Sequence, residues 1–593
     1  MNAARRTVDN FNGAVGASTF GRIFRLEGCG HEKEIKNTKF TTEIRAGLTT
    51  FFTMAYIIAV NASILSDTGG NCVCTDPAGK DPLCQNNADY AVCVQDLNRS
   101  LITATAAIAG FSSFMFGFVT NMPVCLAPGM GLNAYFAYQI VGFHGSGLVS
   151  YSLALTAVFV EGFVFIFLSL IGMRQWLVKV IPVSLKIASA CGIGLFLSEI
   201  GLSYSAGIGA ITGSTATPLE IAGCPQQYLD ENGFCASHKM TSPTMWIGIF
   251  CGGILTAYLM IYKVKSAMIA GIALVSIMSW PRGTSFTYFP HTPIGDDRWN
   301  FFKKVAEFHP IKDTLNVLDW DVSKDPSHFV LALFTFLYVD IIDCTATLYS
   351  MARFSGVVDP DTGDFPRSTL AYCTDAFCIS VGALFGCSPV TAFIESGAGI
   401  AEGGKTGLTA MTCGACFFIS MFFAPIFASI PPWATGCTLI LVGCLMMQQV
   451  SMINWRYIGD SVPAFVTVMF IPFGYSAAYG LIAGLMVYTA LNGLIYLTKM
   501  ISRGRIVPQD EDHREYWTIK PHGKLPWFIT ATQAVASHFG HGSSHVPKQD
   551  AASTKSGESQ ERFRSGSKSS NQELDTVVVI PRDPRDEKVL RKL

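Results

Sequence analysis

Charged residues are scarce in this chain, and they form no cluster of one sign that would suit a polyanionic partner. Asp, Glu, Lys and Arg together make up 14% of the 593 residues, the formal net charge is −1, and half of the residues are hydrophobic. A protein that binds nucleic acid needs a basic patch or stripe, and none is found here. We therefore expect no nucleic-acid partner.

Paired catalytic or metal-binding side chains are also lacking inside the apolar stretches. A membrane enzyme would need a nucleophile or a metal held by His and Cys side chains, and no such set stands out. We therefore expect no enzymatic activity, no metal and no cofactor, with protons as the only candidate coupling ion. The first forty residues do not read as a signal peptide, so the first apolar run is expected to direct insertion.

The chain contains many apolar runs. Many of them are about 17 to 25 residues long, which is the length that a helix needs to cross a bilayer. Eight Lys and Arg residues within 1–46 place the N-terminus in the cytoplasm by the positive-inside rule. Counting the crossings predicts an all-α polytopic membrane protein with 14 segments and both termini in the cytoplasm. The segments are 47–66, 101–120, 123–133, 148–171, 184–202, 244–262, 266–280, 329–350, 369–385, 388–399, 406–429, 432–449, 460–475 and 478–498.

Two polar regions lie outside this pattern. A 47-residue loop over 281–327 is predicted to be extracellular. Within it, Arg298–Phe308 has amphipathic helical spacing, which fits either an interfacial helix or an ordinary loop helix. The tail, 501–593, is polar and has no hydrophobic period, so we expect it to be cytoplasmic and mostly disordered.

Six of the 18 cysteines lie in polar loops that are predicted to face outward. Their spacing fits no zinc pattern well, so disulfides on an oxidising face are favoured over a zinc site. These candidates for disulfide formation are Cys72, Cys74, Cys84, Cys93, Cys224 and Cys235.

Two segments are too irregular to be simple membrane helices, Pro123–Asn133 and Ser388–Gly399. Pro389–Ile394 is expected to be extended, and Ser396 is expected to cap a half-helix that begins at Gly397. Irregular backbone at membrane depth survives only where protein or a water-filled cavity satisfies its polar groups. A broken segment with an acid at the break therefore points to a transport site.

Three sequence patterns recur in the same order in the two halves of the chain. The first pattern is Ile57-Ile58, which recurs as Ile341-Ile342. The second is Pro123-Val124 followed by Gly129-x-Gly131, which recurs as Pro389-Val390 followed by Gly397-x-Gly399. The third is Ile181-Pro182 followed by Gly194, which recurs as Ile430-Pro431 followed by Gly443. Seven segments separate the copies, and because seven is odd the second copy must be inverted. The sequence therefore predicts a 7+7 inverted repeat in which segments 3 and 10 each combine a short strand with a half-helix.

Acidic side chains gather where the two broken segments are expected to meet. Asp340 and Asp343 are three residues apart and share one helical face, and Glu395 stands at the break of segment 10. Two acids in one helical turn within hydrocarbon are costly unless at least one holds a proton, which suits proton-coupled transport. With the Asn133 amide they suit a flat, neutral ligand with N–H donors. An anion exchanger on the same fold is the alternative, which these carboxylates disfavour.

Three further acids lie inside or near the predicted segments. Glu161 in segment 4 is interpreted as a structural acid that bonds to a neighbouring helix. Glu199 and Asp375 lie nearer to segment ends and are interpreted as solvated or structural.

At these residues the chain resembles the AzgA-type purine permeases of fungi, the hypoxanthine–adenine–guanine carriers of the nucleobase–cation symporter group. The resemblance covers nearly all of residues 40–500. The motifs that carry it are LAPGMGLNAYFAY at 126–138, TFLYVDIIDCTATLYSMARF at 335–354 and SPVTAFIESGAGIAEGGKTGLTA at 388–410.

The resemblance implies a core domain that moves against a gate domain in a homodimer. The implied division is an N-terminal region (1–46), core (47–172 and 328–429), gate (173–280 and 430–500), the outer loop (281–327) and the tail (501–593). It further implies proton symport of hypoxanthine, adenine and guanine into the cell across the plasma membrane.

The resemblance also assigns roles to residues. Asn133, Asp340 and Glu395 would contact the purine, and Gly129 and Gly131 would let it approach the backbone. Asp343, together with Asp340, would serve proton coupling.

Overall fold

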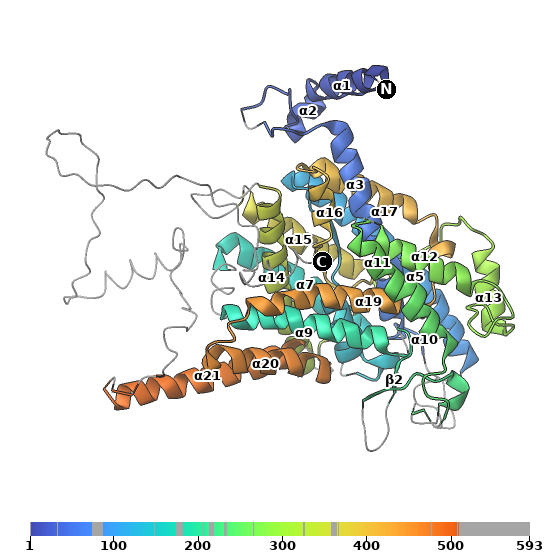
Figure 1. Cartoon of the computed structure of the whole chain (residues 1–593), viewed down its shortest axis with the longest axis vertical. Helices are drawn as coiled ribbons and strands as arrows, with labels where there is room; N and C mark the ends of the chain where they lie inside the picture. The colour runs from blue at the N-terminus through green and yellow to red at the C-terminus, as the bar shows by residue number, and fades with distance from the viewer. Residues whose placement is uncertain are drawn as a thin grey trace, which may run out of the picture. The chain divides into compact units, whose positions relative to one another are not determined.

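Helices dominate the structure, and eight of the helices described are long and apolar enough to cross a membrane. Four shorter apolar helices accompany them. The chain is therefore a multi-pass membrane protein (Figure 1). The coordinates are a computed structural model that describes residues 2–32, 34–73, 87–147, 149–173, 182–204, 207–212, 219–229, 234–235, 237–264, 266–323, 326–356, 365, 367–475, 477–503, 505–506 and 508. All of these residues belong to one unit, Met1–Ala531.

The elements before the outer loop are mainly helices with one short strand at membrane depth. They are α1 (Asn2–Gly16), α2 (Thr19–Phe24), α3 (Phe40–Met54), α4 (Ile57–Ser66), α5 (Ala88–Thr120), β1 (Leu126–Pro128), α6 (Met130–Ala134), the π-helix η1 (Tyr135–Val141), η2 (Phe143–Gly145), α7 (Tyr151–Ile171), α9 (Val183–Leu202), β2 (Ile211–Thr212), β3 (Glu220–Ile221), η3 (Gln226–Tyr228), α10 (Pro243–Ile247), the π-helix η4 (Gly248–Ile254), α11 (Leu255–Ile261) and α12 (Ala267–Ser279).

The outer loop and the second half contain the remaining elements. They are α13 (Pro293–Phe302), α14 (Pro326–Phe354), α15 (Ser368–Leu384), β4 (Val390–Ala392), α16 (Ser396–Ala401), α17 (Gly407–Ser420), α18 (Ala424–Ala428), α19 (Pro432–Met447), η5 (Gln448–Met452), α20 (Ile458–Phe473) and α21 (Ala477–Ile501).

The first predicted segment, 47–66, is not one continuous helix. The structure divides it into α3 and α4, with Ala55 and Tyr56 between them. Ala55 and Tyr56 keep right-handed helical dihedral angles. Ala55 donates its N–H to the carbonyl of Phe51 at 2.8 Å, and Val60 donates to Tyr56 at 3.1 Å. The sequence pattern contains no proline or glycine at this position, so the break was not predicted.

Two helices in the outer regions also differ from the sequence prediction. Helix α5 begins at Ala88, about three turns before the predicted start at Leu101, and so includes the polar residues before that point. Helix α13 begins at Pro293 and ends at Phe302, so only the first part of Arg298–Phe308 is helical. Pro293 explains the earlier start, because proline is preorganised for the first turn of a helix.

Helix–helix contacts form two groups. In the first, α5 packs against α17, α7 against α15, α3 against α17, and α14 against α7. In the second, α9 packs against α19 and α20, α20 against α21, and α12 against α19. The two groups meet where α6 contacts α9, where α12 contacts α3, where α19 contacts α4 and where α14 contacts α21.

Glycines set the distance between the main helix pairs of both groups. Each crossing uses two glycines seven residues apart on each helix, and the helix backbones touch at these points. On α5 and α17, a Cβ placed at Gly414 would lie 2.7 Å from the carbonyl oxygen of Gly110. On α9 and α19, a Cβ at Gly201 would lie 2.5 Å from the carbonyl oxygen of Gly436. Small residues at helix interfaces are how membrane helices gain close packing without a hydrophobic driving force between them.

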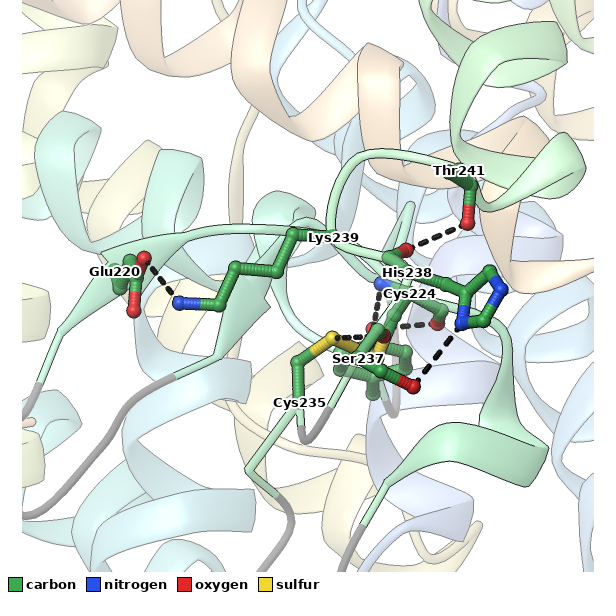
Figure 2. Close-up of a disulfide and its surroundings, with 8 residues drawn as sticks. Glu220, Cys224, Cys235, Ser237, His238, Lys239 and Thr241 are labelled. Carbon is green, nitrogen blue, oxygen red and sulfur yellow. Dashed lines mark hydrogen bonds and ion pairs between the residues drawn. A yellow bond between two sulfur atoms is a disulfide. The ribbon is translucent and has the colours of Figure 1, made fainter.

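Two disulfides are present among the described residues. Cys72, after α4, is bonded to Cys93, which lies on α5 and not in a loop. Cys224 is bonded to Cys235 (Figure 2). The other two candidates, Cys74 and Cys84, lie outside the described residues.

The segment around the Cys224–Cys235 bond is tied down at several further points. The hydroxyl of Tyr204 accepts the N–H of Cys224 and donates to its carbonyl, each at 2.8 Å. Lys239 pairs with Glu220 at 2.7 Å (Figure 2). The loop after α9 is therefore held by covalent, polar and ionic contacts.

We predict that adding a methyl group at a glycine crossing destabilises the protein. Gly414→Ala and Gly201→Ala would each push a Cβ into a facing backbone carbonyl, at a cost of roughly 1–3 kcal/mol. Thermal unfolding of the detergent-solubilised protein should then begin a few degrees lower. Gly493→Ala is the matched control, since it also lies within a helix but has nothing within 4 Å of its added Cβ. Equal melting temperatures for all three variants would contradict the packing argument.

Candidate functional site

The two broken segments meet as a pair of antiparallel strands. β1 and β4 pair in the register Leu126 with Ala392, Ala127 with Thr391, and Pro128 with Val390. All six residues are buried. The expectation that these segments break and come together is confirmed by this pairing.

Backbone hydrogen bonds on both sides of the strand pair are arranged symmetrically. Gly129 donates its N–H to the carbonyl of Pro389 at 2.9 Å, and Phe393 donates to the carbonyl of Cys125 at 3.1 Å. A local two-fold axis through the Ala127–Thr391 pair relates one bond to the other. The extended backbone is thus satisfied by protein at a depth where water is scarce, as irregular membrane backbone requires.

Serine side chains form hydrogen bonds with backbone N–H and carbonyl groups that are not paired between the two strands. The Ser113 hydroxyl on α5 accepts the N–H of Leu126 at 3.0 Å and donates to its carbonyl at 2.9 Å. Ser396 accepts the N–H of Cys125 at 3.0 Å. Ser396 is therefore not the helix cap that the sequence predicted. Helix α16 begins at Ser396 itself, with Glu395 as the preceding residue, because the serine hydroxyl is used across the strand crossing instead.

Glu395 receives a hydrogen bond from the break in the first segment. The Tyr56 hydroxyl donates to Oε1 of Glu395 at 2.8 Å, and Tyr56 is buried. Sequence reasoning missed Tyr56, although one signal was available: Tyr56 precedes Ile57-Ile58 as Asp340 precedes Ile341-Ile342.

A cavity of about 340 Å³ opens beside Glu395. One wall comes from α3 and the start of α16, and the other from the end of α11, the following link and α12. The lining residues are Thr53, Met260, Lys263, Val264, Ala267, Met268, Ile394, Glu395, Gly397 and Ala398. Most of this lining is apolar, and Glu395 and Lys263 are its two charged members. A mostly apolar cavity with few polar groups is typical of small-molecule sites, and its volume lies at the lower end of their range.

Polar groups without a protein partner surround the strand crossing. Asn133 on α6 is fully buried, and neither its amide nitrogen nor its amide oxygen has a partner among the described residues. The hydroxyls of Ser388 and Thr391 are buried and unsatisfied in the same way. An unpaired buried polar group costs about 1–3 kcal/mol. These three side chains are thus candidates for hydrogen bonds to a ligand or to water.

Protein side chains already fill the space next to the two glycines of segment 3. A Cβ on Gly129 would lie 2.7 Å from Cγ2 of Thr391, and a Cβ on Gly131 would lie 2.7 Å from Cγ2 of Ile193 on α9. Close packing across the strand pair and against α9 therefore explains why glycine occurs at both positions. Their suggested role in ligand approach stays a prediction.

Asp340 and Asp343 have different neighbours despite their shared helical face. Asp343 is half-buried and lies near enough to Glu395 for the two charges to interact. Asp340 is fully buried and interacts electrostatically with Glu161 and Asp375. Among the predicted substrate ligands, Glu395 is the one that lines the cavity.

Glu161, Asp340 and Asp375 form a group that we call the acid trio. The three carboxyls come from α7, α14 and α15, and all three residues are 0% exposed. Glu161 was expected to bond to a neighbouring helix, but neither of its carboxyl oxygens has a partner among the described residues. Asp375 lies in the middle of α15 and is buried, so the interpretation as a solvated acid near a segment end was wrong.

Comparison with known proteins identifies the family. Residues 81–483 match the model of the Xan_ur_permease family, which is described as a permease family. The chain belongs to this permease family. The resemblance to purine permeases noted in the sequence is thereby confirmed, and the protein is a transporter rather than an enzyme.

Three relatives show the range of descriptions within the family. An Aspergillus versicolor protein described as "Efflux pump notK'" is 58% identical, with 88% of this chain and 91% of the relative covered. A Schizosaccharomyces pombe "Putative xanthine/uracil permease" is 57% identical, with 88% and 83% covered. A Bacillus subtilis "Guanine/hypoxanthine permease PbuO" is 34% identical, with 77% and 92% covered.

We predict that Tyr56→Phe weakens transport by removing the donor that holds Glu395. A hydrogen bond to a charged group contributes roughly 1.5–3 kcal/mol, so we expect transport efficiency to fall about tenfold or more. The measurement is the initial rate of substrate uptake at several substrate concentrations in cells that express the variant.

Tyr204→Phe is the matched control for this prediction. It also removes one bonded hydroxyl, but from the loop that carries Cys224. Uptake by the Tyr204 variant should equal that of the parent protein once surface expression is equalised. If the two variants behave alike, the Tyr56–Glu395 bond has no specific role in transport.

Proposed function

We propose that the protein imports purine nucleobases, namely hypoxanthine, adenine and guanine, in symport with protons across the plasma membrane. The observation that carries this proposal is the cavity beside Glu395, where an acid held by Tyr56 faces a mostly apolar space of small-molecule size. A carboxylate accepts hydrogen bonds from ring N–H groups, and the apolar wall suits the flat face of a purine. The B. subtilis relative described as a guanine/hypoxanthine permease supports the same substrate class.

The proposed site has two parts. Glu395 contacts the purine in the cavity, and Asn133 and Asp340 bind it when it reaches the strand crossing. Asp343, which interacts with both Glu395 and Asp340, links the two parts electrostatically. A proton on this pathway would offset the cost of several buried carboxylates.

We further propose a fold of 14 segments in a 7+7 inverted repeat, with core and gate domains that move against each other. The local two-fold axis at the strand pair supports this arrangement. So do the helix contacts, because an inverted repeat would make the α5–α17 pair equivalent to the α7–α15 pair, and would make α9 equivalent to α19. The cavity lies between the two groups of helices, where relative movement would open or close it.

We infer a homodimer from the family resemblance. We infer cytoplasmic termini from the Lys and Arg residues before the first segment and from the even number of predicted crossings. The direction of net transport deserves separate measurement, because the A. versicolor relative is described as an efflux pump. An inward proton gradient would drive a symporter toward import.

We predict that cells lacking their own purine carriers will take up labelled hypoxanthine, adenine or guanine when they express this protein. A protonophore should abolish accumulation, and Asp343→Asn should lower it at least tenfold. Glu199→Gln is the control. Glu199 is half-buried like Asp343 but lies on α9, so this variant should leave uptake unchanged.

The same assay can overturn the proposal. Accumulation that survives the protonophore would exclude proton coupling. Faster loss of preloaded purine from expressing cells would support efflux instead. Competition by sulfate or bicarbonate, without competition by purines, would favour the alternative of an anion exchanger.

A further inference from the structure

We propose that the acid trio, Glu161, Asp340 and Asp375, is a proton-binding site outside the cavity beside Glu395, and that it holds the coupling proton during transport, with Asp340 shared between the trio and the proposed purine contacts. This inference rests on the proposed proton symport and adds the location of the proton. Glu161 and Asp375 carry it, since neither lines the cavity.

The carboxyl groups of the trio are buried and have few hydrogen-bond partners. Five of the six carboxyl oxygens in the trio have no hydrogen-bond partner among the described residues. The sixth, Oδ2 of Asp375, accepts the thiol of Cys344 at 2.8 Å. Ionised carboxylates need partners or counter-ions when they leave water. The trio is therefore built for neutral, protonated acids in at least one state of the protein.

The neighbouring titratable groups are another acid and two thiols. The titratable groups that interact with the trio are Asp343 on α14, the Cys344 thiol on the same helix and the Cys378 thiol on α15. None of these is a cation. Like charges that share a site cannot all be ionised, so a change in the field of one acid changes proton binding at the others.

Protons are the ion that we assign to the trio. A divalent ion needs several oxygens that converge on one point, and within the described part of the chain no group of three or more His, Cys, Asp or Glu side chains is arranged to hold a metal ion. Protons bind to separate carboxyl oxygens and remove the repulsion between the three charges.

Asp343 connects the trio to the cavity through its charge. Glu395 lines the cavity and interacts with Asp343, and Asp343 interacts with Asp340 and Asp375. The charge state of Glu395, which substrate binding would alter, therefore reaches the trio through one intermediate acid. This provides a physical route by which substrate in the cavity affects Glu161 and Asp375, which are not among the proposed purine contacts.

The packing of α7 on α15 keeps the trio together. A Cβ at Gly162 would lie 2.5 Å from the carbonyl oxygen of Ala376, so the residues next to Glu161 and Asp375 are in backbone contact. Ser380 adds a bond to the carbonyl of Phe159 at 3.0 Å. The site is therefore held within one group of helices, whereas the cavity lies between two groups.

The experiment uses the full-length protein in proteoliposomes with an inward gradient of one pH unit. Symport of one proton with a neutral purine should concentrate the purine about tenfold in the parent protein. We expect Glu161→Gln and Asp375→Asn to bring this ratio down to about 1. Both variants should still exchange labelled for unlabelled purine across the membrane within about twofold of the parent rate. Glu199→Gln is the matched control and should retain the tenfold accumulation.

Glu161→Asp separates a proton role from a structural role, because it keeps a carboxyl but shortens the side chain. It should restore part of the accumulation that Glu161→Gln loses. If both Glu161 variants fail equally to accumulate purine while Asp375→Asn accumulates it normally, the trio is structural and the inference is overturned.

The outcomes also distinguish this inference from the proposed function. If the parent protein exchanges purine but does not respond to the pH gradient, proton symport itself is wrong. If the parent accumulates purine and the trio variants do so equally well, only the location of the proton is wrong. Accumulation driven by a sodium gradient at equal pH would overturn both statements.

Discussion

The structure depends on satisfying extended backbone inside a membrane protein, and the β1–β4 pair does this at the point where the two halves of the chain cross. Two backbone bonds, Gly129 to Pro389 and Phe393 to Cys125, flank the paired residues. Ser113 and Ser396 then satisfy groups that the ladder leaves over. With these contacts in place, segment 10 can end its strand and start α16 at the cavity, which places Glu395 where a ligand can reach it.

The sequence allowed these broken segments to be predicted because their residue types are so unlike those of a membrane helix. Proline, glycine and one acid within an apolar region leave few alternatives. Local detail was harder to predict. The repeated motif aligned Pro123 with Pro389, whereas the two-fold axis of the strand pair relates Cys125 to Pro389. Hydrogen bonding sets the register of the strands, and short apolar motifs do not determine it.

Side-chain neighbours could be predicted only in part, because a helical period gives the direction of a residue but not what it faces. Asp340 and Asp343 do share a face, yet one meets Glu161 and Asp375 and the other meets Glu395. The difference arises because α7, which carries Glu161, packs against both α14 and α15. Tyr56 was missed for a related reason, since its hydrogen bond to Glu395 depends on how α3 packs against α16.

The separation of the cavity from the acid trio has a mechanical consequence. The cavity walls come from both groups of helices, so any movement between the groups changes access to Glu395. The trio lies on α7, α14 and α15, and all three of its residues are buried. A proton held there would travel with its group and would not be exposed whenever the cavity opens. Coupling between the cavity and the trio would then depend on the charge interaction through Asp343, because Asp343 interacts with Glu395 on one side and with Asp340 on the other.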